Sequence, residues 1–156
     1  MRRGWVFPVA LGLQCLGIYL AASMPALVYP ALMGISYSFL LLGVVNNLNL
    51  WGFRLLLVGL LLNLAALLVH GGYMPVTPEA LLEAGFSPEA HLESGSYLVG
   101  SKSILLARKD TRVWFLTDVF PLAAPVRRVF SIGDVIVATA ALVLLGQIIW
   151  NRVKHV

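Results

Sequence analysis

Four long apolar segments alternate with polar ones along the chain, and this pattern predicts an integral membrane protein. The apolar segments cover about residues 5–23, 25–45, 53–70 and 131–150. Each can cross the roughly 30 Å hydrocarbon core of a bilayer, which takes a helix of about 20 apolar residues. From Gly4 to Phe53 there is no Asp, Glu, Lys or Arg, whereas the helices of water-soluble proteins need a polar face. We therefore predict an all-α membrane protein with four transmembrane helices in one domain, residues 1–156.

The polar segment before the fourth helix, residues 71–130, is predicted to form an extracytoplasmic loop domain. Residues 77–85 and 87–95 are similar units, each with a hydroxyl residue, a proline, glutamates and a final glycine. A hydroxyl N-cap before proline is typical of a helix start, so each unit predicts a short helix on the membrane surface. Residues 104–107 and 113–116 are apolar and flank a charged centre. This favours a β-hairpin, with an interfacial helix as the alternative.

Residues at the ends of the third and fourth helices have predicted structural roles. Gly71 and Gly72 end the third helix, and Pro75 keeps the following chain extended. Ser131 and Asp134 have the spacing of a capping box, in which the serine is the N-cap and the carboxylate lies near the exposed helix amides.

Small and polar residues inside the helices indicate where helices pack together. Gly34 and Ser38 form a small-x-x-x-small pair in the second helix, and such pairs allow two helices to approach closely in lipid. Asn63 is the strongly polar residue deep in the third helix. We predict that it makes an interhelical hydrogen bond.

The basic residues next to the apolar segments predict the orientation in the membrane. They are Arg2, Arg3, Arg54, Arg152 and Lys154, opposed by Asp134 alone, and they account for the net charge of +4. Basic residues favour the cytoplasmic side, so both termini are predicted there, in the inner membrane of a bacterium, with the loop domain outside. The bilayer is the expected environment, and no basic cluster indicates nucleic acid. The single Cys15 excludes an intrachain disulfide and a Cys-based metal site.

Three short segments carry a family resemblance, with the patterns GGxMP, WFLxDxxPL and FSIGD. The matching residues are Gly71, Gly72, Met74 and Pro75; Trp114, Phe115, Leu116, Asp118, Pro121 and Leu122; and Phe130, Ser131, Ile132, Gly133 and Asp134. On these residues the chain resembles an uncharacterised bacterial four-helix integral-membrane family, one of the domain-of-unknown-function groups. The resemblance covers roughly residues 50–150 and implies no activity.

A weaker likeness lies at the start of the last helix, where residues 130–135 read Phe-Ser-Ile-Gly-Asp-Val. This is similar to the Phe-Asn-x-Ala-Asp-Ser signature of bacterial lipoprotein signal peptidase, a four-helix membrane enzyme with two catalytic aspartates near the outer face. The asparagine and the last serine of the signature are absent, as is the enzyme's upstream Gly-x-x-x-Asn-x-x-Asp-Arg motif. The resemblance implies Asp118 and Asp134 as a catalytic pair.

His70, Asp118 and Asp134 all map to the predicted outer membrane boundary, so they are the candidates for chemistry. Two carboxylates sharing a proton activate water in aspartic proteases. A histidine with two aspartates can hold a divalent cation, and His70 alone can be an axial ligand of a haem or chlorin. The structural alternative is that Asp134 caps its helix, Asp118 pairs with Arg127 or Arg128, and His70 caps the third helix. We favour the structural alternative, and predict no metal.

Three functions from different classes remain open. The first is a non-catalytic accessory or scaffold subunit of a larger membrane complex, with a protein partner in the membrane. The second is an intramembrane aspartyl hydrolase using Asp118 and Asp134. The third is a transporter or channel component, which we place last because a pathway needs more polar residues at mid-membrane. The sequence predicts the first, leaves open whether the protein is an enzyme, and identifies no cofactor.

Overall fold

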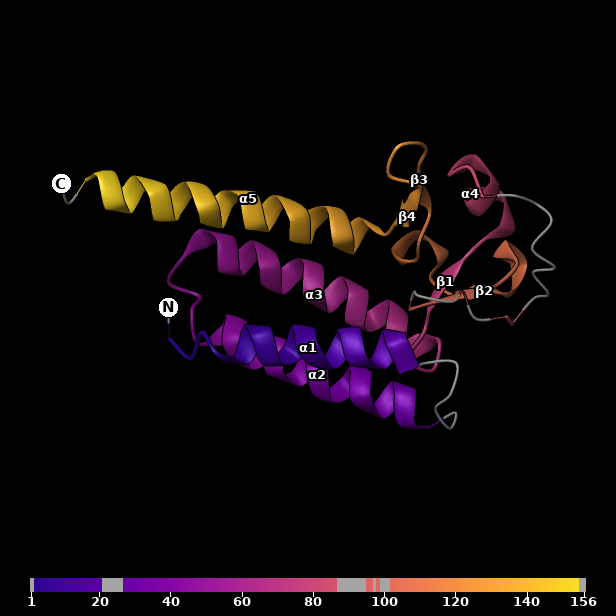
Figure 1. Cartoon of the computed structure of the whole chain (residues 1–156), viewed down its shortest axis with the longest axis horizontal. Coiled ribbons are helices and arrows are strands. Elements are labelled where there is room, and N and C mark those ends of the chain that lie inside the picture. The colour runs from indigo at the N-terminus through magenta and orange to yellow at the C-terminus, as the bar shows by residue number, and fades with distance from the viewer. Residues whose placement is uncertain (1, 21–26, 87–94, 97, 99–101, 155–156) are drawn as a thin grey trace.

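The computed structural model describes residues 2–20, 27–86, 95, 96, 98 and 102–154, and it is mostly helical. The long helices of this part are α1 (Val6–Leu20), α2 (Val28–Val45), α3 (Trp51–Val69) and α5 (Ile132–Val153). They run side by side, and the short elements gather at one end, which we call the loop end (Figure 1). The opposite end, at the α2–α3 turn, is called the turn end.

Three helices, α2, α3 and α5, are long and apolar enough to cross a membrane, which supports the predicted membrane class. The α1 helix is equally apolar, but its 15 described residues are shorter than the predicted 5–23. Residues 21–26 lie outside the description. Among the described residues, three helices are therefore long enough to span a membrane, and α1 is a shorter apolar helix.

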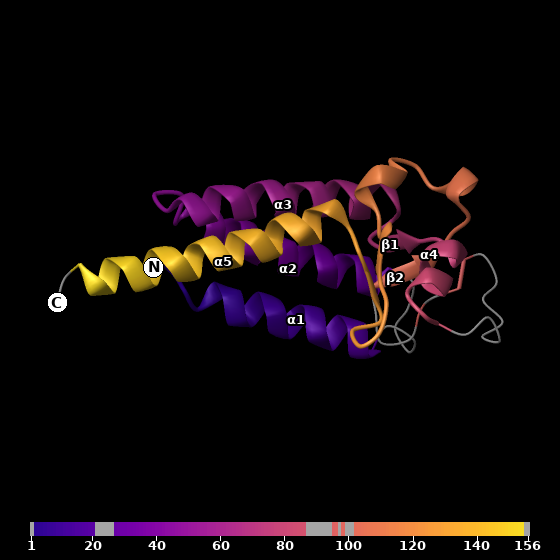
Figure 2. The same ribbon diagram turned by 90° about the horizontal axis from the view of Figure 1, so that it is seen from above.

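The helices pack as two pairs, α1 against α2 and α3 against α5, which are joined through α2 and α3 (Figure 2). Glycines permit the closest approach. A Cβ on Gly59 of α3 would lie 2.9 Å from the Gly133 carbonyl oxygen of α5, and a Cβ on Gly43 of α2 would lie 2.6 Å from Val6 of α1. The interhelical seams of this bundle therefore depend on small residues, as expected for helices in lipid.

The predicted packing role of Gly34 and Ser38 is wrong. A Cβ on Gly34 would meet no atom of the described residues within 4 Å. Ser38 is exposed and donates a hydrogen bond to the Gly34 carbonyl oxygen of its own helix, at 2.8 Å. The pair lies on an outward face of α2, because the face that contacts α1 carries Gly43, Ser36 and Met33 instead.

In its described residues, the loop end contains seven short elements. They are β1 (Met74–Val76), α4 (Pro78–Glu83), β2 (Ser103–Leu105), β3 (Phe120–Leu122), β4 (Arg128–Phe130) and two 3-10 turns, η1 (Arg108–Asp110) and η2 (Trp114–Leu116). The first predicted short helix is confirmed as α4, whose N-cap Thr77 accepts a hydrogen bond from the Ala80 amide at 3.2 Å. The second, residues 87–95, lies outside the described residues except for Gly95.

The β-hairpin predicted over residues 104–116 is wrong. Strand β2 pairs in parallel with β1, where Pro75 is opposite Ile104. Residues 114–116 form a 3-10 turn, because Val113 has a φ of 43° and interrupts the extended chain. Strand β2 finds its partner in the fully buried β1 instead of the nearby apolar run. An antiparallel hairpin does occur, between β3 and β4.

Candidate functional site

The candidate site begins with the first turn of α5, where Ser131 and Asp134 cap the helix. The Ser131 amide donates to Oδ2 of Asp134 at 3.1 Å, and the Asp134 amide donates to Oγ of Ser131 at 3.0 Å. These reciprocal bonds make a capping box, which the Ser-x-x-Asp spacing encodes locally. The box fixes the Asp134 carboxylate at the loop end of α5.

Asn63 of α3 ties this cap to the neighbouring helix. Its Nδ2 donates to Oδ1 of Asp134 at 2.7 Å, and its Oδ1 accepts from the Ser131 hydroxyl at 2.8 Å. The predicted interhelical hydrogen bond of Asn63 is therefore present in the structure, between α3 and α5. Gly133, against which Asn63 lies, has no side chain to block this contact.

Lys102, just before β2, completes the cluster. Its Nζ lies 3.4 Å from Oδ1 of Asp134, and both side chains are about three-quarters buried. Burial lowers the pKa of Lys102, but the Asp134 carboxylate and, less strongly, Tyr37 and Asp118 more than offset this, so the pKa is raised. Lys102 is a cation at neutral pH. We missed it in the sequence, where the available signal was a lone cation immediately before an apolar strand.

Asp118 is the second carboxyl of the site, and its side chain is only 3% exposed. Its Oδ2 accepts from the Ser103 hydroxyl at 3.0 Å, and its amide donates to the Pro75 carbonyl oxygen at 3.0 Å. Within the described chain no donor reaches Oδ1. Burial raises the pKa of Asp118 to about 6, although nearby Lys102 lowers it; Asp134 raises it and the Ser103 bond lowers it. This carboxyl can therefore exchange a proton near neutral pH.

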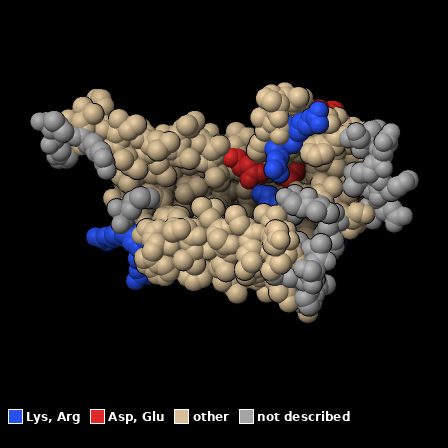
Figure 3. All heavy atoms as spheres, in the orientation of Figure 1, with Lys and Arg blue, Asp and Glu red and all other residues tan. Residues whose placement is uncertain are grey.

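Both carboxylates lie at the head of a groove of about 880 Å³ between α1 and α5. Ile18 of α1 and Val135, Ala138 and Leu142 of α5 line its apolar length. Lys102, Arg128, Asp118 and Asp134 line the head. Figure 3 shows this hollow on one face of the molecule, with acidic and basic side chains gathered at one end of it. The groove is thus amphipathic along its length.

The predicted ion pair of Asp118 with Arg127 or Arg128 is not found in the structure. The ion pair found among the described residues is Lys102–Asp134, and no pair joins Asp118 to Arg127 or Arg128 there. Arg128 lines the head of the groove, whereas Arg127 is exposed, with its side chain close to Gly85. The pairing of Asp118 was misjudged because Lys102, which supplies the neighbouring positive charge, was not considered.

His70 ends α3 and is separate from this cluster in its contacts. Its ring Nδ1 lies 2.7 Å from the Ala66 carbonyl oxygen, and Gly71 and Gly72 follow with positive φ angles of 65° and 94°. The Gly72 amide donates to the Leu67 carbonyl oxygen at 2.7 Å, closing the helix end as glycine commonly does. In the portion of the chain described, no three His, Cys, Asp or Glu side chains gather as a metal site would require.

The fold and site define a helical protein with three helices able to cross a membrane and a charged cluster at one end of an apolar groove. The chain belongs to a Family of unknown function (DUF5317), whose sequence profile matches residues 1–146. The predicted membership of an uncharacterised family is confirmed. No curated protein and no solved structure matches the chain.

Proposed function

We propose that the protein is a non-catalytic accessory or scaffold subunit of a larger membrane complex. The observation that carries this proposal is the C-terminal end of α5. The Gly52 amide at the start of α3 donates to Oε1 of Gln147 at 3.1 Å, so α5 residues after Gln147 extend past the bundle. Figures 1 and 2 both show this extension.

The extension is apolar and exposed. Ile149 and Trp150 each expose 62% of their surface and Val153 exposes 67%. Only 11% of the apolar, potentially membrane-spanning part of α5 is buried within the chain, whereas 39% is buried in α2 and in α3. Gly146 lies one turn earlier, and no atom of the described residues lies within 4 Å of a Cβ position there, so another helix can approach closely. The occupant we propose is a helix of another protein in the same membrane.

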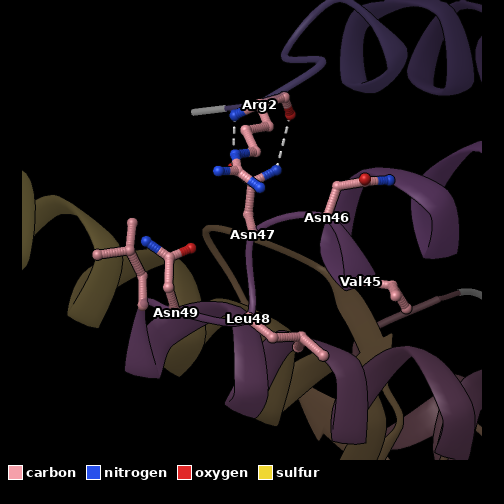
Figure 4. A pocket seen from close by; sticks show the side chains of 7 residues that line it. Arg2, Val45, Asn46, Asn47, Leu48 and Asn49 are labelled. Carbon is pink, nitrogen blue, oxygen red and sulfur yellow. Dashed lines mark hydrogen bonds between the residues drawn. The ribbon is translucent and has the colours of Figure 1, made fainter.

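The proposed topology has four spans, with both termini on the cytoplasmic side of a bacterial inner membrane and the loop end outside. Its support is that basic residues gather at the turn end. Asn47 holds the Arg2 backbone through two hydrogen bonds, of 2.7 and 2.8 Å (Figure 4), and Arg54 donates to the Leu48 carbonyl oxygen. Basic residues favour the cytoplasmic side. Alkaline phosphatase, which folds only after export, should be active when inserted at Gly95 and inactive when fused to the C-terminus; the reverse pattern would contradict the topology.

A site-specific crosslinking experiment tests the subunit proposal. A photoreactive residue at Ile149 or Val153, in membranes of the native host, should give one protein adduct shared by both positions. The matched controls are Trp51 at the same end of α3 and Leu61 on its exposed face, which should give none. The captured protein, tagged in turn, should retrieve this chain in fixed stoichiometry. Lipid adducts alone at Ile149 and Val153 would overturn the proposal.

The second candidate function is an intramembrane aspartyl hydrolase. It is favoured by Asp118 and Asp134 lining one groove, with the pKa of Asp118 raised to about 6. It is opposed by the commitment of Asp134, both of whose oxygens already accept hydrogen bonds from Asn63 and Ser131 and whose charge is paired with Lys102. Aspartic dyads instead share one proton between two carboxyls. Cleavage of a lipid-anchored peptide by the wild type, but by neither D118N nor D134N, would establish this function.

A further inference from the structure

The groove between α1 and α5 is chemically complementary to an amphiphilic molecule. Its apolar part follows α5 from Asp134 to Leu142, about 12 Å along the helix axis. Its head lies at the loop end, where the charged side chains of Lys102, Arg128 and Asp118 meet it. A molecule that fills the groove therefore needs a polar head and an apolar tail of at least that length.

The charges at the head specify more than polarity. Both oxygens of Asp134 are occupied by donors from the chain. Lys102 bonds to Asp134 through one long contact of 3.4 Å, so donors remain on its ammonium group. Arg128 is exposed and reaches the same head. The head thus offers two cations to an anionic oxygen.

Asp118 supplies the opposite requirement. Asp118 lines the groove and exposes only 3% of its surface. Its Oδ1 has no hydrogen-bond donor within the described chain. A buried carboxylate oxygen without a donor is costly, because it loses water without gaining a hydrogen bond. A ligand that brings an N–H donor, preferably cationic, would satisfy this oxygen.

We propose that the groove binds one phospholipid with a primary-amine headgroup. Its phosphate contacts Lys102 and Arg128, its ammonium donates to Oδ1 of Asp118, and one acyl chain lies along Val135, Ala138 and Leu142. A partner's transmembrane helix fits less well, because a basic side chain would satisfy Asp118 but bring no anion for the two cations. The inference does not depend on the proposed subunit role, which involves the opposite end of α5.

Lipid retention by the purified full-length chain tests this inference. The protein in detergent is equilibrated with equal amounts of phosphatidylethanolamine, phosphatidylcholine and phosphatidylglycerol carrying the same acyl chains, and bound lipid is counted by native mass spectrometry. We expect one phosphatidylethanolamine per chain, retained at least about fivefold over the other two, because among the three headgroups only this one brings Asp118 a cationic N–H donor. Phosphoethanolamine, the headgroup alone, should compete poorly because it leaves the apolar groove unfilled.

Matched variants separate the contributions. D118N should remove the preference for phosphatidylethanolamine, and D110N, at an exposed aspartate, should keep it. R128Q should lower retention of all three lipids, whereas R112Q should not. A138W should block the groove, and L61W, on the exposed face of α3, should leave it open. Circular dichroism establishes that each variant is folded.

Two outcomes would overturn the inference, and both are read on the wild type. Equal retention of all three lipids would mean that the groove holds ordinary annular lipid. Preference for phosphatidylglycerol would mean that the head selects for net negative charge and not for a primary amine at Asp118. If photoreactive residues at Ile149 and Val153 capture no protein while the wild type still prefers phosphatidylethanolamine, only the subunit role is contradicted. The two proposals therefore fail separately.

Discussion

Nδ2 of Asn63 donates a hydrogen bond of 2.7 Å to Oδ1 of Asp134, across 71 residues of sequence. The bond joins α3 to the first turn of α5, and the Ser131 hydroxyl closes the network by donating to the other atom of the Asn63 amide. Because the surrounding helices are apolar, these groups have few alternative partners. The network therefore fixes the register of α5 along α3.

The first prediction concerns Asn63. N63L keeps the number and branching of the side-chain heavy atoms but leaves the Ser131 hydroxyl without its acceptor and Asp134 without one donor. We expect the free energy of unfolding to fall by about 1–3 kcal/mol, the usual cost of a lost bond to a charged group, reduced somewhat in membranes. Titration with SDS, followed by circular dichroism, measures it. N49L, at an exposed turn position, is the control, and equal stability of both variants would disprove the role of the network.

The second prediction concerns the seam between α3 and α5. A Cβ on Gly133 would overlap the Asn63 amide oxygen and lie 2.9 Å from the Gly59 carbonyl oxygen. Overpacking of this kind costs about 1–3 kcal/mol, so G133A should unfold at lower SDS concentration. G146A is on the same helix with open space around it, and alanine favours helix, so it should be neutral or slightly stabilising. A stable G133A protein would show that the seam can relax.

The third prediction is a pH dependence due to Asp118. Its pKa is raised by burial from 3.8 to about 6. The native state therefore holds a proton that the unfolded state releases, and the free energy of unfolding falls as pH rises from about 4 to about 6, by at most about 3 kcal/mol. Above that range the contribution is constant.

The difference between wild type and D118N isolates this contribution. Lys102, Asp134, Arg128 and the Ser103 hydroxyl face Asp118, but they are present in both proteins. D118N should lose the fall in stability between about pH 4 and 6, and D110N should retain it. If the profiles of wild type and D118N are parallel, Asp118 does not titrate in that range.

Local patterns were readable in the sequence. The long helices follow from apolar runs whose length alone matches a bilayer. The Ser131–Asp134 cap is encoded by four consecutive residues, and the α4 helix by Thr77 and Pro78. In each case the residues that decide the structure are neighbours in the chain, so no knowledge of tertiary contacts was needed.

The interhelical hydrogen bond of Asn63 was predicted without its partner, and the partners in other contacts between distant segments were not readable. Ser103 and Asp118 are 15 residues apart, and Lys102 and Asp134 are 32 apart. Both contacts depend on the parallel pairing of β1 with β2, which requires the chain to return over the loop end. The expected hairpin was wrong because an apolar run beside a charged turn can pair with any strand. Here β2 pairs with β1 and not with residues 113–116. Asp118 and Asp134 were expected at one membrane boundary, but Lys102 and Ser103, which join them at the head of the groove, were missed for the same reason.

The last prediction tests whether Lys102 and Asp134 act as a pair. Their charges lie 3.4 Å apart with about a quarter of each side chain exposed. K102M leaves the partly buried Asp134 carboxylate without a counterion, and D134N leaves the partly buried Lys102 ammonium without one. We expect each substitution to lower the free energy of unfolding by about 1–3 kcal/mol. In K102M/D134N neither charge remains, so the loss should be less than the sum by at least about 1 kcal/mol. K109M, which removes an exposed lysine, should change little and should be additive with D134N. If K102M is also additive with D134N, the two charges do not stabilise each other and Asp134 is held by Asn63 and Ser131 alone.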